Sequence, residues 1–390
     1  MSAVILGAAR TPIGAFLGGL APLSAPKLGA IAIKCALERA GVGADQVDEV
    51  FMGNVVQAGV GQAPARQAAL GAGIPNSVPC TTINKVCGSG LKSVMLAATQ
   101  IAAGEARLIV AGGMESMSNA PYLARGLRAG LPLGEHKLED ANLTDGLMDA
   151  YGHGHMGLGG EIVAEQCGLG REDQDRFALG SYEKALRAQG EGAFDAEIVP
   201  VEVPGRKGVV TLVNKDETPR ETSLESLAKL QPAFKAGGTI TAGNASKLND
   251  GGAAVIVASE ERARELGAKP IARIVAQAQF AHEPDLFLAA PKGAIERCLK
   301  KAGWSIADVD LFEVNEAFSG IECVRRELDI PEEKFNVNGG AVALGHPIGA
   351  SGARLLVTLL YALRARSKKR GVASLCLGGG EAVALAVELT

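Results

Sequence analysis

Cys87 lies in the stretch NKVCGSGL, residues 84–91, where small residues follow it directly. A helix is predicted to begin near Gly88, because the apolar residues from Leu91 to Ala102 recur at helical spacing. A thiol at the N-terminus of a helix would have a lowered pKa, and the Cys87 N–H could donate to an oxyanion. The alternative is a small buried cysteine at a close packing contact, and spacing alone does not separate the two.

Three further residues have side chains suited to proton transfer or to hydrogen bonding with a substrate, and they lie in turns or at strand ends. His346 stands among glycines in NGGAVALGHPIGASG and could be the base that activates a cysteine thiol. Cys376, in SLCLGGG, and Asn315, in FEVNEAF, end predicted strands, where α/β proteins often place catalytic groups. Each has an ordinary alternative, because most buried cysteines are inert and a strand-tip asparagine often caps a helix.

Two other motifs, one for dinucleotide binding and one for metal binding, lack the sequence context that these functions require. GHGHMG, residues 152–157, fits a dinucleotide-binding pattern, but no predicted strand precedes it and no acidic partner is placed a βαβ unit later. His153 and His155 are close in sequence, yet no third ligand has a suitable spacing. We therefore expect no metal site.

The elements that would position these residues occur twice. A turn, a helix from Leu91 and the glycine-ended strand RLIVAGG form the first copy. HPIGASG, a helix over 352–366 and the strand VASLCLGGG form the second, and Leu355 stands 264 residues after Leu91. Strands that alternate with helices favour a parallel α/β design, and the recurrence predicts a duplicated unit.

The region between the two copies, roughly residues 118–248, differs in composition. It is rich in Pro, Gly and charged residues and weakly periodic, with one good helix near 171–189. Long insertions of this kind usually carry function. We interpret it as an insertion that folds over a two-half core.

Composition excludes several classes of protein. The net charge of −4 and an aromatic content of 4% argue against a nucleic-acid-binding protein. No apolar run reaches the roughly 18 residues that span a bilayer, and the N-terminus reads as a first strand rather than a leader. Seven scattered cysteines without a C-x-x-C pair indicate a reduced, cytoplasmic protein rather than a disulfide framework.

Taken together, these motifs resemble the thiolase family, most of all its biosynthetic acetyl-CoA acetyltransferases. The resemblance covers nearly the whole chain and is carried by RTPIGAF, MGNVVQAGVGQAPARQAAL, NKVCGSGLKSV, AGGMESMSNAPY, PAFKAGGTITAGNAS, NEAF, GGAVALGHPIGASG and CLGGG. Two positions depart from the family pattern. Lys247 stands where the family usually carries glycine, and Glu381-Ala382 replaces a usual Met-Gly or Gln-Gly pair.

The resemblance implies the thiolase fold. This α/β fold has two duplicated βαβαβαββ halves that form a five-layer αβαβα core, plus an inserted loop domain. Residues 1–117 would form the N-terminal half, completed by a strand near 250–270. Residues 118–249 would be the loop domain that covers the coenzyme A site, and residues 250–390 would be mostly the C-terminal half.

The resemblance also implies a ping-pong mechanism. Cys87 would attack an acyl-CoA thioester while His346 takes its proton, leaving acyl-Cys87. Cys376 would then remove a proton from the α-carbon of a second acetyl-CoA, whose enolate His346 and a water held by Asn315 would stabilise. The backbone N–H groups of Cys87 and Gly378 would form a second oxyanion hole. The product would be acetoacetyl-CoA, and the reverse reaction would cleave it.

Coenzyme A would lie across the inserted region, so CoA thioesters are substrates and no cofactor is expected. Met156 and Phe318 would shape the acyl pocket, Ser246 would meet the pantetheine, and Arg220 would face the nucleotide. The full set of family positions is Leu147, His155, Met156, Arg220, Ser226, Phe234, Ala242, Ser246, Ala317 and Phe318. Thiolases form dimers or tetramers, so we expect a homo-oligomer, with residues about 118–140 tethering tetramers.

Three rival interpretations stay open. A degradative 3-ketoacyl-CoA thiolase would use the same residues on longer chains, but more often has Cys-Ser-Ser-Gly where this chain has Cys-Gly-Ser-Gly. A decarboxylating ketoacyl synthase would want a Cys-His-His or Cys-His-Asn set. A non-catalytic acyl-CoA-binding subunit would have lost a catalytic group, and none of those expected is lost here.

Overall fold

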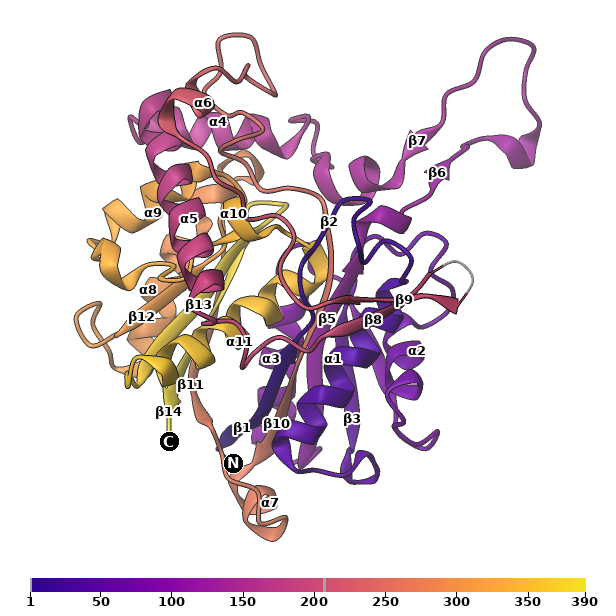
Figure 1. Ribbon diagram of the computed structural model, residues 1–390, viewed down its shortest axis with the longest axis vertical. Helices are drawn as coiled ribbons and strands as arrows, with labels where there is room; N and C mark the ends of the chain where they lie inside the picture. Colours follow the sequence, from indigo (N-terminus) through magenta and orange to yellow (C-terminus); the bar gives the residue numbers. More distant parts are fainter. Residues whose placement is uncertain (1, 206–207) are drawn as a thin grey trace.

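The computed structural model describes residues 2–205 and 208–390 (Figure 1). Within these residues, ten strands form one mixed sheet. Its order is β12 (Leu311–Val314), β13 (Arg370–Leu377), β14 (Glu381–Leu389), β11 (Ala272–Ala281), β1 (Ala3–Arg10), β10 (Asn249–Ser259), β5 (Leu108–Ser116), β3 (Glu49–Gly53) and β4 (Cys80–Ile83), with β2 (Gly14–Ala15) paired to β10.

The sheet repeats one pattern on either side of its middle. In the N-terminal half, β3 runs parallel to β5, and β5, β10 and β1 then pair antiparallel. In the C-terminal half, β12 runs parallel to β13, and β13, β14 and β11 pair antiparallel in the same way. The halves join where Val4 and Ile5 of β1 pair with Arg273 and Ala272 of β11. The predicted duplication is thus present in the strand order.

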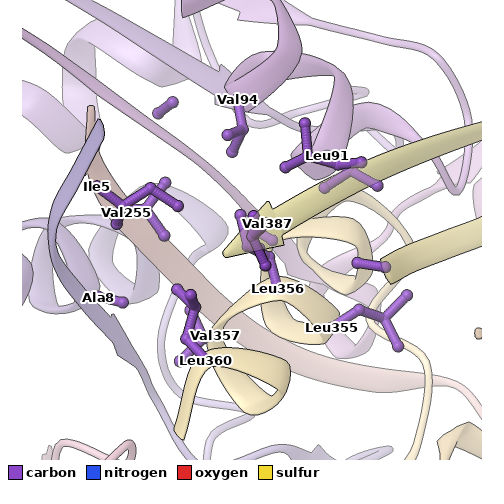
Figure 2. Close-up of a cluster of buried hydrophobic side chains, with 14 of the residues drawn as sticks. Ile5, Ala8, Leu91, Val94, Val255, Leu355, Leu356, Val357, Leu360 and Val387 are labelled. Atoms are coloured by element: carbon purple, nitrogen blue, oxygen red, sulfur yellow. The ribbon is translucent and has the colours of Figure 1, made fainter. Parts of the chain in front are cut away.

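Helices form three layers around the two half-sheets. Helices α3 (Ser89–Ala103) and α11 (Ile348–Ala365) lie between the halves, and their apolar side chains share one core with both (Figure 2). Helices α1 (Ala25–Ala40) and α2 (Pro64–Gly71) cover the outer face of the N-terminal half. Helix α8 (Ala290–Ala302) covers that of the C-terminal half. This arrangement confirms the predicted five-layer αβαβα core.

The predicted elements lie close to their sequence positions. The first strand is β1, RLIVAGG is in β5, VASLCLGGG begins in β13, and the helix expected near 171–189 is α5 (Arg171–Gly190). Helix α11 begins four residues before the predicted start at Gly352, with Pro347 as its N-cap residue. Proline is tolerated there because the first N–H groups of a helix have no intrahelical partner.

Two core helices bear on the prediction that no apolar run is long enough to span a bilayer. Charged residues interrupt the longest apolar segments, among them Lys92 in the first helix and Arg354 in the second. Val86–Ala103 and Ile348–Ala365 are long and apolar enough by length and composition. However, 56% and 83% of these segments are buried inside the protein, as helices between two half-sheets must be.

The insertion between β5 and β10 contains several short elements. A two-stranded ribbon of β6 and β7 begins a long arm that extends away from the body of the protein (Figure 1). The insertion consists of β6 (Tyr122–Leu123), β7 (Glu139–Asp140), α4 (Met156–Gln166), α5, the hairpin of β8 (Val201–Pro204) and β9 (Val210–Val213), and α6 (Leu224–Ala228). Two short helices, α7 (Glu260–Glu265) and α9 (Glu322–Glu327), connect strands of the core.

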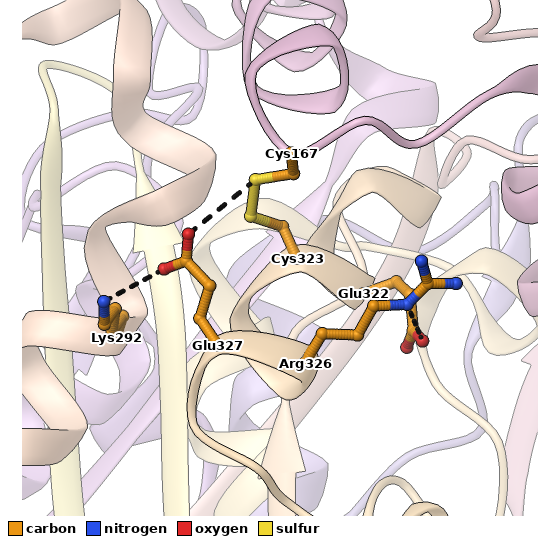
Figure 3. The surroundings of a disulfide bond; sticks show 6 residues. All are labelled: Cys167, Lys292, Glu322, Cys323, Arg326 and Glu327. Carbon is orange, nitrogen blue, oxygen red and sulfur yellow. Dashed lines mark hydrogen bonds and ion pairs between the residues drawn. A yellow bond between two sulfur atoms is a disulfide. The ribbon is translucent and has the colours of Figure 1, made fainter.

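A disulfide joins Cys167 to Cys323 (Figure 3). Cys167 is the C-cap residue of α4 and Cys323 lies in α9, with their Cα atoms 5.9 Å apart, a usual separation for this bond. The prediction that the cysteines are reduced is therefore wrong for these two, because a sequence separation of 156 residues gives no pairing signal. The other five cysteines are free.

Candidate active site

Cys87 lies in a tight turn between β4 and α3. Gly88 N–H donates to the Lys85 carbonyl at 3.0 Å, and Ser89 N–H donates to the Val86 carbonyl at 3.1 Å. The Ser89 hydroxyl also donates to Val86 O and accepts the Lys85 N–H, at 2.6 and 2.8 Å. Val86 has φ 46°, a left-handed conformation that a β-branched residue adopts only when its surroundings hold it there. Such strain is common next to catalytic groups.

The Cys87 thiol lies against the end of β13. It accepts hydrogen bonds from the backbone N–H groups of Gly378 and of Cys87 itself, the two donors expected to form an oxyanion hole. The ion pair from Lys85 Nζ to Glu381 Oε2, at 2.5 Å, joins the Cys87 turn to the start of β14. Glu381, one of the two departures from the family pattern, therefore has a partner within the nucleophile turn.

The pKa of Cys87 differs from the sequence prediction. Although the residue as a whole is half-buried, desolvation of its thiol raises the pKa to about 12, against an ordinary value of 9.0. The N–H donors of Gly378 and Cys87 oppose this shift without cancelling it. The predicted lowered pKa is wrong, because the loss of water around the thiol outweighs the N–H donors that favour the thiolate.

His346 is buried, and its hydrogen bonds fix which ring nitrogen is basic. Its backbone N–H donates to Asn249 Oδ1 at 2.9 Å, and its Nδ1 lies 2.6 Å from Ser351 Oγ. Because the single Ser351 hydroxyl hydrogen goes to the Pro347 carbonyl, Ser351 must accept the Nδ1–H of His346. The other nitrogen, Nε2, is buried and has no hydrogen-bond partner among the described residues. It is a free acceptor.

Burial keeps the imidazole of His346 neutral. Desolvation, and then the positive charge of Arg354, lower its pKa to about 3. At neutral pH the ring therefore carries only its Nδ1 proton before the reaction begins, and its Nε2 can take a second one. A protonated thiol and a neutral imidazole are the resting forms of the two groups.

The first turns of α3 and α11 bring the two halves of the site together. A Cβ added to Gly90 would lie 2.7 Å from the Ala353 backbone nitrogen, so only glycine permits this approach. Next to this contact, Ile348 of α11 belongs to an apolar cluster against which Cys87 packs. His346 stands two residues before Ile348, so the turns that carry the nucleophile and the base converge.

Cys376 is fully buried on β13. Burial, and then the charge that Cys87 would carry, raise its pKa well above the ordinary value, so the two sulfurs interact. Asn315 follows β12, and its backbone N–H donates to the Ser374 carbonyl at 3.0 Å. Within the described residues, neither atom of its buried side-chain amide has a partner, which leaves it able to bind a substrate oxygen or a water.

Several of the expected coenzyme A residues form one aromatic group. His155 stacks on Phe234 with ring centroids 4.5 Å apart, and Phe234 meets Phe318 edge to face at 5.7 Å. Burial lowers the pKa of His155, whose Nδ1 accepts the Gly157 N–H at the start of α4. Next along the chain, Met156 packs near Gly378, so this group reaches the end of β13.

The remaining expected residues occupy three places. Ser246 N–H donates to the Ala317 carbonyl at 3.0 Å, next to the aromatic group. Leu147 packs with the same apolar cluster as Cys87. Arg220 lies over the ring of Tyr182, whereas Ser226 and Ala242 are exposed.

Sequence reasoning missed Glu115, which lies one residue before the end of β5 and links the two halves. Its carboxylate accepts the N–H groups of Val55 and Gly349 at 3.0 and 2.9 Å and the Asn54 amide at 2.6 Å. Burial nevertheless raises its pKa to about 7. The stretch GGMES offered a signal, since a carboxylate at the buried end of a strand needs donors, but their identity is a property of the fold.

Metal ligation has one geometric candidate in the described residues. Cys167, Cys323 and Glu327 place their ligand atoms within 4.8 Å of one another. The two sulfurs are bonded to each other, and Glu327 also pairs with Lys292 at 3.1 Å (Figure 3). A disulfide sulfur is not a thiolate, so this group does not suit a metal as it stands.

Comparisons with known proteins agree with this geometry. The family model described as "Thiolase, N-terminal domain" matches residues 3–261, and "Thiolase, C-terminal domain" matches residues 268–389. The acetyl-CoA acetyltransferases of Cupriavidus necator and Pseudomonas aeruginosa are 53% and 52% identical, covering 99% and 98% of this chain and 98% of each relative. The crystal structure of the Bacillus anthracis acetyl-CoA acetyltransferase superposes with a TM-score of 0.97 at 42% identity, covering 100% of this chain and 99% of that one.

Proposed function

The chain belongs to the thiolase family, and from this membership we propose that it is an acetyl-CoA C-acetyltransferase. It joins two acetyl-CoA molecules into acetoacetyl-CoA and CoA, and it catalyses the reverse thiolysis. The observation that supports this most is a desolvated Cys87 thiol beside the Gly378 N–H, together with a neutral His346 whose Nε2 is a buried acceptor free of partners in the described residues.

In the first half-reaction, the Cys87 sulfur attacks the thioester carbon as its proton passes to His346 Nε2. The Ser351 hydroxyl holds the imidazole in the required tautomer, since it accepts the Nδ1–H. The carbonyl oxygen takes up the negative charge and is met by the N–H groups of Cys87 and Gly378. Loss of one such donor typically costs about 3 kcal/mol in barrier height. CoA leaves with the proton of the Cys376 thiol, so that acetyl-Cys87 remains, His346 keeps the Cys87 proton on Nε2, and Cys376 becomes a thiolate.

In the second half-reaction, Cys376 takes a proton from the α-carbon of a second acetyl-CoA. Its high pKa makes the thiolate a strong base, and its burial keeps water from competing for the proton. Asn315, directly or through a water, and His346 stabilise the enolate oxygen. The carbanion then attacks acetyl-Cys87, the bond to sulfur breaks, and the leaving Cys87 sulfur regains its proton from His346 Nε2. No metal or redox cofactor takes part in this scheme.

The coenzyme A moiety crosses the inserted region. The stacked pair of His155 and Phe234, with Phe318 and Met156, encloses the acyl and thiol end. Ser246 meets the pantetheine, and Arg220 faces the nucleotide. Support comes from the contacts within the aromatic group and from the approach of Met156 to Gly378 at the end of β13.

We also propose a cytoplasmic homo-oligomer in which the arm of residues 118–140 contacts a second copy. The arm exposes an unusual number of large apolar side chains, namely Tyr122, Leu127, Leu131, Leu133 and Leu138. Light scattering coupled to gel filtration tests this. We expect a dimer or tetramer, and a monomeric wild-type chain would contradict the proposal.

The decisive test of the function is intact-mass analysis after mixing with acetyl-CoA alone. We expect one acetyl group per chain, absent in Cys87→Ala and retained in the matched control Cys35→Ala, whose thiol lies on α1. An unmodified wild-type chain would favour a non-catalytic acyl-CoA-binding subunit. Steady-state thiolysis of acetoacetyl-CoA against longer 3-ketoacyl-CoA substrates separates the proposed enzyme from a degradative thiolase.

A further inference from the structure

Lys247 places an ammonium group in a confined site beside the candidate active site. Its Nζ donates to the Tyr182 hydroxyl and to the Val342 carbonyl, and it lies 4.8 Å from the centroid of the Tyr182 ring. Burial lowers its pKa to about 7, an effect that Arg220 adds to and Glu316 opposes. A lysine held away from water in this way must be compensated by the groups it contacts.

The Val342 carbonyl needs such a donor for a specific reason. Val342 lies in α10 (Ala341–Leu344), a single helical turn directly before Gly345 and His346. In a continuing helix this carbonyl would accept the N–H of the residue four positions later, which is His346. That N–H instead donates to Asn249 Oδ1. Lys247 therefore replaces the hydrogen bond that the turn toward His346 removes.

The other end of the same residue is also held. The Val342 N–H donates to Glu316 Oε2 at 3.2 Å, and that carboxylate accepts the Ser181 hydroxyl at 2.6 Å. Glu316 and Lys247 thus fix the N–H and the carbonyl of one residue in α10. The Lys247 bond joins α10 to the inserted region, and the Glu316 bond joins α10 to the segment that follows β12.

The segment 247–249 contacts the base-bearing loop at two points. Lys247 bonds the Val342 carbonyl, and two residues later Asn249 bonds the His346 N–H. Between these points Gly345 has φ 107°, and a Cβ there would lie 2.4 Å from the Asn249 side chain. The backbone before His346 consequently has little freedom while both contacts persist.

We propose that Lys247 is a positioning residue for His346, acting through its hydrogen bond to the Val342 carbonyl. It touches no reacting atom in this scheme. Its role rests on the proposed function, because it serves the transfer of the Cys87 proton to His346 Nε2. Misplacement of a catalytic group by about 1 Å can cost roughly 100-fold in rate, so loss of this bond has a measurable effect on the chemical step.

The test compares Lys247→Met with wild type in single-turnover acetylation of Cys87, measured by quenched-flow mass spectrometry. Methionine keeps most of the apolar stem and removes the ammonium. We expect the acetylation rate to fall roughly 10- to 100-fold, with KM for acetyl-CoA nearly unchanged. Lys34→Met is the matched control, because Lys34 is exposed on α1, and its rate should equal that of wild type.

A double-mutant cycle separates positioning from a general structural role. If Lys247 acts through His346, then Lys247→Met has no further effect on the slow acetylation that remains in His346→Ala. Propylammonium added to Lys247→Ala should restore part of the rate, since it can reach Tyr182 and Val342. This second variant also serves if the methionine variant does not fold.

The outcomes are distinct. A wild-type chain that acetyl-CoA does not modify refutes the proposed function. A modified wild type with an equally fast Lys247→Met refutes the positioning role alone. An equal loss in the His346→Ala background, or a change confined to KM, also overturns it, because either would show that Lys247 acts elsewhere.

Discussion

The resting protonation states of Cys87 and His346 give a prediction that pH titration can test. With a pKa of about 12 instead of 9.0, the Cys87 thiolate at pH 7 is populated about 1,000-fold less than in an ordinary cysteine. This difference corresponds to about 4 kcal/mol. His346, with a pKa of about 3, stays neutral across the same range. The free protein should therefore hold no thiolate–imidazolium pair.

Ultraviolet absorbance of the thiolate measures this directly. The difference between wild type and Cys87→Ser should show no thiolate step between pH 6 and 9, with Cys35→Ser as the control for a thiol outside the site. Nitrogen chemical shifts of His346 should stay those of a neutral ring with its proton on Nδ1 from pH 5 to 8. A thiolate step with a midpoint below pH 8 would refute the argument that desolvation dominates the site.

The lowered pKa of His346 also predicts how the stability of the protein changes with pH. Unfolded protein protonates this histidine below about pH 6.5, whereas folded protein does not until about pH 3, so stability is lost as pH falls through this window. The loss attributable to His346 is about 2 kcal/mol at pH 5. Urea titrations of wild type and His346→Asn at pH 7 and 5 isolate it, because Glu115, whose raised pKa acts in the opposite sense, is present in both. Parallel pH dependence in the two proteins would contradict the prediction.

Three further predictions concern structure away from proton transfer. Reduction of the Cys167–Cys323 disulfide lowers the free energy of unfolding by up to about 5 kcal/mol, since the bond closes a sequence separation of 156 residues; calorimetry with a phosphine reductant measures it, and an unchanged transition would argue against the bond. Gly90→Ala destabilises by about 1–3 kcal/mol because its Cβ would meet α11, whereas Gly180→Ala, with open space in α5, stabilises by up to about 1 kcal/mol in the same urea titration. Equal changes in the free energy of unfolding for the two variants would show that α3 and α11 pack less closely at Gly90 than described. Glu381→Gln changes the free energy of unfolding by less than about 1 kcal/mol, because its ion pair is partly exposed; a larger loss by urea titration would contradict this.

The fold was predictable where local pattern and chemistry coincide. Apolar spacing from Leu91 onward and the recurrence at Leu355 identified the two central helices, because each must bury one face against a sheet. The strands β5 and β13 were visible for the same reason, although β5 continues past its glycines to Ser116. The motifs that carry Cys87 and His346 were visible as well. The roles of these residues in catalysis stay predictions.

The electrostatics of the site were not predictable from spacing. A helix start beside Cys87 suggested a lowered pKa, but the opposite shift comes from side chains that the fold brings from other parts of the chain. Ser351 fixes the tautomer of His346, and Glu115 accepts a hydrogen bond from the first turn of α11. Both were missed because individual hydrogen bonds leave no pattern in the sequence. The disulfide joins elements whose proximity has no sequence signature.

The pairing of β1 with β10 has a consequence for how the chain is made. All eight residues of β1 are buried, and its long partner strand begins only at Asn249. At a synthesis rate of about 5–20 residues per second, roughly 12–50 s pass between the emergence of the two strands from the ribosome. During that interval the apolar strand has no native neighbour on this side, so nascent chains depend on chaperone occupancy or on slow, late closure of the N-terminal half.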